Sequence, residues 1–368
     1  MLPEAYAVYR LPHDSHATLV SQTEGKPAEL LSCADLNGRR GFVIAPFDIG
    51  PAQPIVVIRP DEVSRQEIPP VPDTVPIPVN VPVSVPDPYA VDFANFHAQL
   101  MQGTFRKIVL ARCADEALPA DADPLQLFYR ACQLYPRLFI ALVHTPQSGT
   151  WLTATPEILL EGSEHRWRTI ALAGTMKLVG DQLNGEGETV TWTTKNIEEQ
   201  RIVATYIAEC LEQFSADFSE EGPRTVRAAN LVHLRSDFSF TLPTTDRIGN
   251  LLQSLHPTPA VCGLPKREAF RFIVGNERTP RRYYSGFMGM LDPTAATHLY
   301  VSLRCMNIDG NRCHLYAGGG LLRESTGELE WQETEAKLET MRRLLNLSNG
   351  NDKNTQHQCI AIRKASTS

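Results

Sequence analysis

The chain has 368 residues, of which 42% are hydrophobic and 21% charged, so it can bury a large core as one large domain or two ordinary ones. Its net charge of −7 argues against a nucleic-acid surface, and the lack of an apolar run of about 18 residues excludes a membrane-spanning helix. Residues 1–14 lack the basic and apolar segments of a signal peptide, and the eight cysteines include no CxxC pair. We therefore expect a cytoplasmic protein with reduced thiols and neither nucleic-acid nor membrane partners.

Near the N-terminus, short apolar runs between turn residues predict strands at 6–11, 41–46 and 55–58. Residues 69–88 hold eight prolines that alternate with valine and isoleucine. Because proline cannot donate a ladder hydrogen bond, this segment is predicted to be an extended connector or a sheet edge. Periodicity then predicts, in chain order, a helix at 90–102, a strand at 107–113, a helix at 124–134, strands at 138–144, 149–155 and 167–173, and a long helix at 191–214.

The C-terminal part continues the mixture of strands and helices. The pattern predicts strands at 228–234 and 238–242, helices near Leu251 and at 266–274, strands at 286–290, 298–308 and 313–317, and a final helix at 331–346. Many strands follow one another as hairpins, which favours an α+β fold over a doubly wound α/β fold. The polar tail at 348–368 is predicted to be disordered.

The final helix carries charged residues along a face that should be buried. Glu330, Glu333 and Lys337 are spaced i, i+3 and i+7, which places them on one helical face. The same face continues with Met341 and Leu344, which are apolar. Carboxylates and a lysine on a core-facing stripe predict a site for a hard cation and a charged substrate.

Lys107 opens the strand KIVLAR, and its same-face neighbours Val109 and Ala111 are apolar. A lysine that faces the core loses solvation and is a candidate general base. The alternative is a lysine at a strand end that extends its amine to water.

Glu157 lies between Pro156 and an apolar run. Burial would raise the pKa of its carboxyl and allow it to donate a proton, whereas the alternative is a turn glutamate. Glu199 lies on the apolar stripe of its helix and needs a buried partner. A metal shared with Glu333 would supply one, and so would a structural salt bridge to Lys337 or Arg304.

Two glycine-containing segments follow predicted strands, at 317–320 (AGGG) and 173–175 (AGT). Both are predicted as loops whose backbone N–H groups can approach an anion, although such glycines more often form only a tight turn. His233 and His256 have no histidine partner at i+3 or i+4, so they predict no metal site, and either could donate a hydrogen bond to a substrate.

In this order along the chain, nine segments resemble the chorismate-utilising enzymes and, among them, the isochorismate synthases. The segments are KIVLAR, ATPEILL, LAGT, KNIEEQ, HPTPAVCGLP, YYSGFMG, SLRC, AGGG and EWQETEAK. The resemblance implies a single α+β domain at 1–347 with two stacked antiparallel-rich sheets surrounded by helices. Residues 1–88 would form an N-terminal subregion and 89–347 the catalytic core.

The resemblance also implies roles for the residues that match these segments. Lys107 would activate water for attack on ring carbon 2 of chorismate, and Glu157 would protonate the departing 4-hydroxyl. Glu199 and Glu333 would hold Mg²⁺, with Glu330 nearby. The implied substrate-binding positions are Ala173, Gly174, Thr175, His233, Ala260, Tyr284, Arg304, Gly318, Gly320 and Lys337. Among these, Arg304, Tyr284 and the glycine backbone would hold the enolpyruvyl carboxylate.

Two positions and one missing segment bear on the branch of the family. Ala173 stands where aminodeoxychorismate synthases have a nucleophilic lysine, and Ala260 stands where salicylate synthases have threonine. No glutamine amidotransferase segment is attached, so water is the expected nucleophile and isochorismate the expected product. Asn196 departs from the aspartate usual in relatives and is expected to weaken Mg²⁺ binding.

A menaquinone pathway is favoured over a siderophore pathway, and a monomer or homodimer is expected. Two alternatives stay open. One is a lyase that continues to salicylate and pyruvate, and the other is a chorismate-binding protein without activity.

Overall fold

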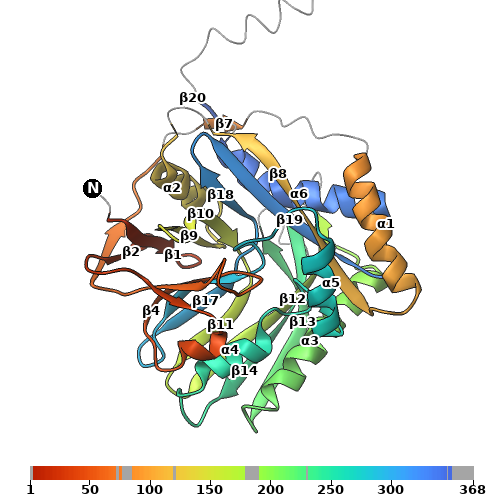
Figure 1. Ribbon diagram of the computed structural model, residues 1–368, viewed down its shortest axis with the longest axis horizontal. Helices are drawn as coiled ribbons and strands as arrows, with labels where there is room; N and C mark the ends of the chain where they lie inside the picture. The colour runs from red at the N-terminus through yellow and green to blue at the C-terminus, as the bar shows by residue number, and fades with distance from the viewer. Residues whose placement is uncertain are drawn as a thin grey trace, which may run out of the picture.

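The computed structural model describes residues 3–71, 74–76, 85–118, 122–178, 190–228, 231–345 and 347–349, and two nine-stranded sheets dominate these residues (Figure 1). All pairings between the described strands are antiparallel. The predicted class, α+β with two stacked antiparallel-rich sheets in a single domain, is confirmed.

The first sheet contains, in spatial order, β15 (Gly263–Leu264), β8 (Lys107–Ala117), β19 (Arg312–Leu321), β18 (Cys305–Asp309), β10 (Gly149–Thr155), β9 (Phe139–Thr145), β1 (Ala5–Arg10), β2 (His16–Gln22) and β6 (Glu62–Glu67). The second contains β13 (Phe218–Ala228), β14 (Leu231–Thr241), β12 (Arg166–Lys177), β11 (Ile158–Ser163), β17 (Thr297–Val301), β16 (Phe287–Leu291), β4 (Gly41–Ala45), β5 (Ile55–Ile58) and β3 (Ala28–Leu30).

Helices cover the outer faces of both sheets and one end of the molecule (Figure 1). One apolar cluster joins α2 (Pro124–Leu134) and α6 (Gly327–Leu345) to the first sheet. A second joins α3 (Thr194–Leu211), α4 (Ile248–Leu255) and the short helix η1 (Cys33–Leu36) to the second sheet. A third packs α1 (Asp87–Met101) and α5 (Lys266–Asn276) around the start of β8.

The inner faces of the two sheets share a core rich in aromatic residues. Phe139 of the first sheet stacks on Tyr300 of the second, with ring centroids 4.2 Å apart and an interplanar angle of 2°. Trp151 is fully buried in the same cluster. Apolar side chains alternate to this face because successive residues of a strand point to opposite sides.

The predictions for 55–58, 124–134 and 149–155 match β5, α2 and β10 at both ends. The predicted strand at 298–308 is wrong as a single element, because it divides into β17 and β18 in different sheets. Arg304 has a φ of +44° at the point of division, in the left-handed region, so the chain leaves the extended conformation there.

The predictions of glycine loops at 317–320 and 173–175 are also wrong. The first segment belongs to β19, which continues to Leu321, and the second belongs to β12, which continues to Lys177. Conversely, the strands predicted separately at 228–234 and 238–242 fall mostly within one strand, β14, which pairs along β12, while residue 228 ends β13. β2, β3, β6, β11, β13 and β15 were not predicted. β6 illustrates why, since all of its residues are exposed and it has no apolar alternation.

The proline-rich segment and the C-terminal tail are only partly described. Within 69–88, residues 74–76 form the short strand β7, and 87–88 already belong to α1. The first two residues of the predicted tail, 348–349, lie in β20 (Leu347–Asn349), which pairs with β7. Residues 72–73, 77–84 and 350–368 lie outside the described residues, as does Cys359. The seven described cysteines are free, and all but Cys113 are buried. No described helix is long and apolar enough to cross a membrane.

Candidate active site

Two segments that pass from one sheet to the other bring Glu157 and Arg304 into the space between the sheets. Glu157 follows Pro156 and separates β10 of the first sheet from β11 of the second. Arg304 separates β17 from β18 in the opposite direction. The segments lie side by side, because Val301 N–H donates to Glu157 O at 2.9 Å and Ala154 N–H donates to Arg304 O at 3.1 Å. Both side chains therefore reach the same interior space.

Burial controls the charge of Glu157. Glu157 is only 3% exposed to solvent. Desolvation raises the pKa of its carboxyl to about 8, against opposing effects of Lys107 and Lys337. The carboxyl is thus protonated at neutral pH and can donate a proton.

Lys107 and Glu199 form a buried ion pair beside this carboxyl. Lys107 is fully buried, and its Nζ lies 2.9 Å from Glu199 Oε1. Burial alone would raise the pKa of Glu199, but Lys107 and Lys195 hold it below its ordinary value. The partner of Glu199 is therefore Lys107, rather than the Lys337 or Arg304 predicted for a structural salt bridge.

The glycines of β19 provide the room for these side chains. A Cβ at Gly320 would overlap Glu199 Oε1 and lie 2.9 Å from Lys107 Cε, and one at Gly319 would lie 2.8 Å from Glu330 Oε2. On the same face of the strand as Gly320, a Cβ at Gly318 would lie 2.8 Å from the Tyr284 hydroxyl. The run is required for close side-chain approach to a strand, not for a turn.

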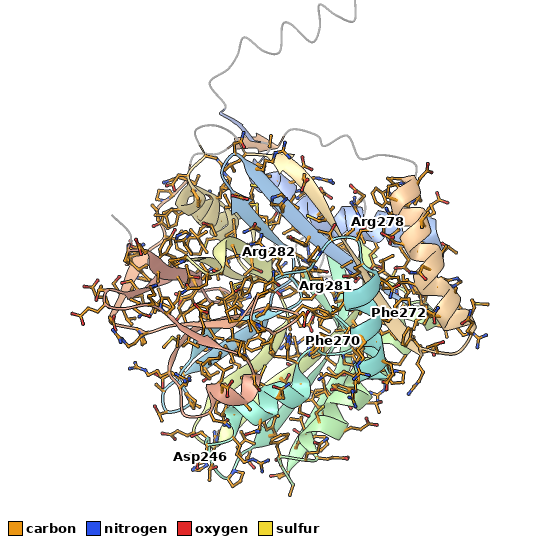
Figure 2. The ribbon with its side chains drawn as sticks, viewed as in Figure 1. Asp246, Phe270, Phe272, Arg278, Arg281 and Arg282 are labelled. Atoms are coloured by element: carbon orange, nitrogen blue, oxygen red, sulfur yellow. The ribbon has the colours of Figure 1, made fainter. Side chains whose placement is uncertain are left out.

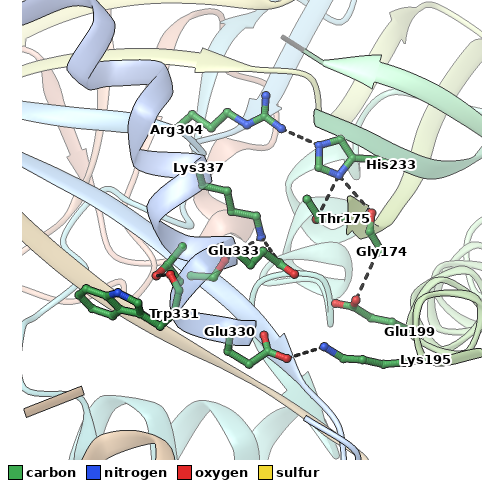
Figure 3. A network of polar contacts seen from close by, with 12 residues as sticks. Gly174, Thr175, Lys195, Glu199, His233, Arg304, Glu330, Trp331, Glu333 and Lys337 are labelled. Carbon is green, nitrogen blue, oxygen red and sulfur yellow. Dashed lines mark hydrogen bonds and ion pairs between the residues drawn. The ribbon is translucent and has the colours of Figure 1, made fainter. Parts of the chain in front are cut away.

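The α6 helix presents its charged face to this strand, as predicted (Figure 3). Lys337 Nζ donates to Glu333 Oε1 at 2.7 Å and to Gly318 O at 2.8 Å. Glu330 is 1% exposed and accepts a short hydrogen bond from Lys195 at the start of α3. Burial and Glu333 raise the pKa of Glu330 to about 7, against the effect of Lys195.

A chain of polar contacts links the arginine to the carboxylates (Figure 3). Arg304 Nη2 lies 2.5 Å from His233 Nε2, and His233 Nδ1 lies 3.2 Å from Gly174 O. Burial, followed by the charges of Arg304 and Lys337, lowers the pKa of His233 well below its usual value. The neutral ring therefore accepts from Arg304 through Nε2 and donates from Nδ1 to Gly174 O. Gly174 N–H in turn donates to Glu199 Oε2 at 3.2 Å.

Arg304 is fully enclosed, and burial lowers its pKa to about 10, so it still carries a charge at neutral pH. It donates to Ala228 O but has no carboxylate partner among the described residues. A buried, charged guanidinium without an anion is suited to bind a substrate carboxylate.

One cavity collects most of the predicted positions. The predicted residues that line it are Glu157, Ala173, Gly174, Thr175, Glu199, His233, Ala260, Tyr284, Arg304, Gly318, Gly320 and Lys337. Lys107, Glu330 and Glu333 do not line it. Lys107 instead lies behind Gly320 and Glu199, and these two residues line the cavity.

The sequence analysis missed several residues of the site. Lys195 was not singled out, although KNIEEQ contains it one residue before Asn196. Tyr316 lines the cavity and stacks on Tyr284 with ring centroids 5.6 Å apart. Its alternation with Gly318 and Gly320 on one face of β19 would have been the signal, if the glycines had been recognised as strand residues.

The residues fit a magnesium ion by their chemistry. Glu199, Glu330 and Glu333 offer carboxylate oxygens, the ligands that Mg²⁺ prefers. Glu330 Oε2 is buried and has no hydrogen-bond partner, which leaves one acceptor for a cation. The carboxylates are paired with Lys107, Lys195 and Lys337, and their oxygens do not gather within 4.8 Å of one another. The one described group that does is Cys113, Asp115 and His314, at the far end of β8 and β19.

Comparisons with known proteins agree with this architecture. The chain is 29% identical over 238 residues to the isochorismate synthase EntC of Escherichia coli, covering 64% of this chain and 61% of that protein. It is 32% identical over 260 residues to the salicylate biosynthesis isochorismate synthase of Pseudomonas aeruginosa, covering 69% of this chain and 54% of that protein. The chain thus spans less than two thirds of these curated relatives.

The fold is that of a solved relative. The structure of MenF, the menaquinone-specific isochorismate synthase from Escherichia coli, superposes with a TM-score of 0.77 at 23% identity, covering 93% of this chain and 88% of that chain. The family model described as chorismate binding enzyme matches residues 74–346. This range contains all the residues that line the cavity. The chain therefore belongs to the chorismate binding enzyme family.

Proposed function

We propose that this protein is an isochorismate synthase, an isomerase that converts chorismate to isochorismate. The observation that carries the proposal is a cavity between the sheets that combines a protonated carboxyl, Glu157, with a guanidinium that has no described carboxylate partner, Arg304. Glu199 also lines this cavity and pairs with the buried Lys107 behind it. The names of the relatives, which are isochorismate synthases, support the same reaction.

In the proposed reaction, water adds at ring carbon 2 and the 4-hydroxyl leaves as water. Lys107 takes the proton of the attacking water, and Glu157 gives a proton to the departing oxygen. The acid must hold a proton before it can donate one. Desolvation raises the pKa of Glu157, so its carboxyl meets this requirement.

The charged groups around the cavity would bind the two carboxylates of chorismate. Arg304 and the Tyr284 hydroxyl would hold the enolpyruvyl carboxylate, beside the backbone of Gly318 to Gly320. Glu199 and Glu333, with Glu330, would hold Mg²⁺, which would supply positive charge for the ring carboxylate. Asn196, buried beside Gly174, is expected to weaken that binding relative to an aspartate.

The branch of the family is part of the proposal. Ala173 and Ala260 both line the cavity, so neither a lysine nucleophile nor a threonine is present at these positions. A place in menaquinone biosynthesis is proposed, and a related structure has that specificity. We also propose a cytoplasmic monomer or homodimer, and the free thiols of the described cysteines support the reducing compartment.

The test is incubation of purified protein with chorismate and Mg²⁺, with products separated by liquid chromatography. Isochorismate alone is the expected product. Salicylate with pyruvate would move the protein to the lyase branch, and a product formed only with ammonia would indicate an aminating enzyme. Absence of turnover both with and without ammonia would overturn the proposed function.

A further inference from the structure

The β8 strand, which begins with Lys107, lacks a full partner on one side. β19 pairs with it on one edge from Ile108 to Ala117. On the other edge, β15 has only two residues, which pair with Lys107 and Ile108. Val109 N–H still donates to Cys262 O at 2.7 Å, but no described strand follows along the edge. Unpaired strand groups need other partners when they are buried.

Two side chains take the place of the missing strand. Ala111 N–H donates to Glu277 Oε1 at 2.8 Å, and Arg281 Nη2 donates to Val109 O at 2.9 Å. Glu277 and Arg281 thus bind two successive backbone groups on this edge of β8, the Ala111 N–H and the Val109 carbonyl, as a neighbouring strand would.

The same arginine also binds the segment that leads to β15. Arg281 Nη1 donates to Val261 O at 2.6 Å, while its Nε donates to Glu277 Oε2 at 2.7 Å. Figure 2 shows Arg281 beside α5, between that helix and the first sheet. Its guanidinium also lies 4.3 Å from the centre of the Phe47 ring. One residue therefore connects β8, the loop at Val261 and the end of β4.

Both ends of this connection reach the cavity. Val109 and Val261 line it, and Ala260 lies next to Val261. Lys107 is two residues before Val109 on the same face of β8. We propose that Glu277 and Arg281 form a positioning pair, which replaces a strand at the edge of β8 and holds the cavity wall at Ala260 and Val261 in register with Lys107.

The cost of burial supports a geometric role. The side chains of Glu277 and Arg281 are 4% and 3% exposed. A buried ion pair loses solvation and is often no more stabilising than apolar residues of similar size. Apolar residues could not donate to Val109 O and Val261 O or accept from Ala111 N–H. The pair provides these directed bonds, which fix relative position.

The kinetic part of this inference rests on the proposed function. Arg281→Lys keeps the charge, but a lysine lacks the planar fork that reaches two carbonyl oxygens at once. We expect kcat/KM for chorismate to fall about ten-fold or more, with a raised KM, because small displacements of binding groups have large effects on rate. The matched control is Arg278→Lys, three residues away, whose side chain is 54% exposed and pairs with Asp92 at the surface. It should leave kcat and KM unchanged.

A second readout does not depend on activity. Amide hydrogen exchange of peptides covering 107–113 and 258–264 should be faster in Arg281→Lys than in wild type, and unchanged in Arg278→Lys. If Arg281→Lys does not fold, Glu277→Gln replaces it, because glutamine keeps an acceptor for Ala111 N–H and removes the charge beside Arg281.

The outcomes separate the two proposals. If wild type does not turn over chorismate, the proposed function fails, and faster exchange at both peptides still supports the positioning pair. If Arg281→Lys is less stable but keeps wild-type kcat, KM and exchange at temperatures where it is folded, the pair has only a structural role and the inference is overturned.

Discussion

At the scale of residues, two carboxyls near Lys107, those of Glu157 and Glu199, differ in charge. Glu157 accepts no ion-pair contact among the described residues and is held neutral by desolvation. Glu199, whose side chain is 12% exposed, keeps its charge because Lys107 and Lys195 lie beside it. The cations beside Glu199 therefore outweigh its desolvation, whereas those near Glu157 do not.

The first prediction concerns Glu157→Gln. Since the pKa of Glu157 is raised from 4.5 to about 8 in the folded protein, its favourable contribution is complete below about pH 4.5 and is lost as the pH rises through 8. The wild-type free energy of unfolding should fall relative to that of Glu157→Gln by up to about 1.4 kcal/mol per pH unit across this window. Urea unfolding of both proteins between pH 5 and 9 measures the difference, and parallel curves would contradict the raised pKa.

The pH dependence of kcat in wild type should show the same titration. Because Glu157 must carry a proton to donate it, kcat should fall above pH 8, and Glu157→Gln should have almost no activity at any pH. A variant that retains wild-type kcat at pH 7 would show that another group is the acid.

The second prediction concerns Lys107→Ala. It should abolish isochorismate formation, and it should also lower the free energy of unfolding by about 3 kcal/mol, because it leaves the Glu199 carboxylate buried without its partner. Chorismate turnover and chemical denaturation measure the two effects. Lys177→Ala is the control, since that lysine is half exposed at the end of β12 and should affect neither. Near-wild-type turnover in Lys107→Ala would remove Lys107 from the mechanism.

At the scale of elements, the site depends on α6 lying close to β19 and β8. Arg112 of β8 stacks on Trp331 at 3.7 Å and donates to Thr334 Oγ1 at 2.8 Å. Arg112 and Arg342 both pair with Glu335, which is 4% exposed. These contacts fix the face of α6 that carries the charged residues of the site.

The third prediction tests the close approach of this helix and strand. Gly320→Ala should disrupt the pair formed by Glu199 and Lys107, because the added Cβ would occupy the position of Glu199 Oε1. We expect loss of turnover and a weaker response of the melting temperature to added Mg²⁺. Gly275→Ala is the control, because its Cβ would meet no atom within 4 Å and it lies in the helix α5.

In the control, the helix should gain up to about 1 kcal/mol from the replacement of glycine by alanine. Thermal denaturation with and without Mg²⁺ compares the two variants. An active Gly320→Ala protein with an unchanged Mg²⁺ response would show that the glycine does not make room for the carboxylate.

At the scale of the whole molecule, the cavity exists because two sheets share one core while the chain passes between them. The contact between Phe139 and Tyr300 joins the sheets next to the crossing segments. The cavity and the stability of the sandwich therefore depend on the same inner face.

The fourth prediction concerns this joint. Phe139→Ala should lower the free energy of unfolding by about 3–5 kcal/mol, because it removes a fully buried aromatic side chain and leaves a cavity. Unfolding should remain a single transition when fluorescence and circular dichroism are compared, since both sheets share the core. Separate transitions for the two probes would show that the sheets are independent.

Periodicity in the sequence predicted which side chains face inward along the helices and strands that it identified. Periodicity correctly placed Lys107 with Val109, and it placed Glu330, Glu333 and Lys337 on the inner face of α6. It also determined the mixture of hairpins and helices that makes the fold α+β. These properties are local, because they follow from the spacing of residues within one helix or strand.

Contacts between inward-facing side chains of separate elements depend on the tertiary fold. Periodicity gives no information on contacts between separate elements, so it could not pair Glu199 with Lys107 or place Glu277 and Arg281 at the edge of β8. It also misread the glycines of β19, because a missing side chain suits a turn and a close packing contact equally well, and only the neighbouring carboxylates show which is present.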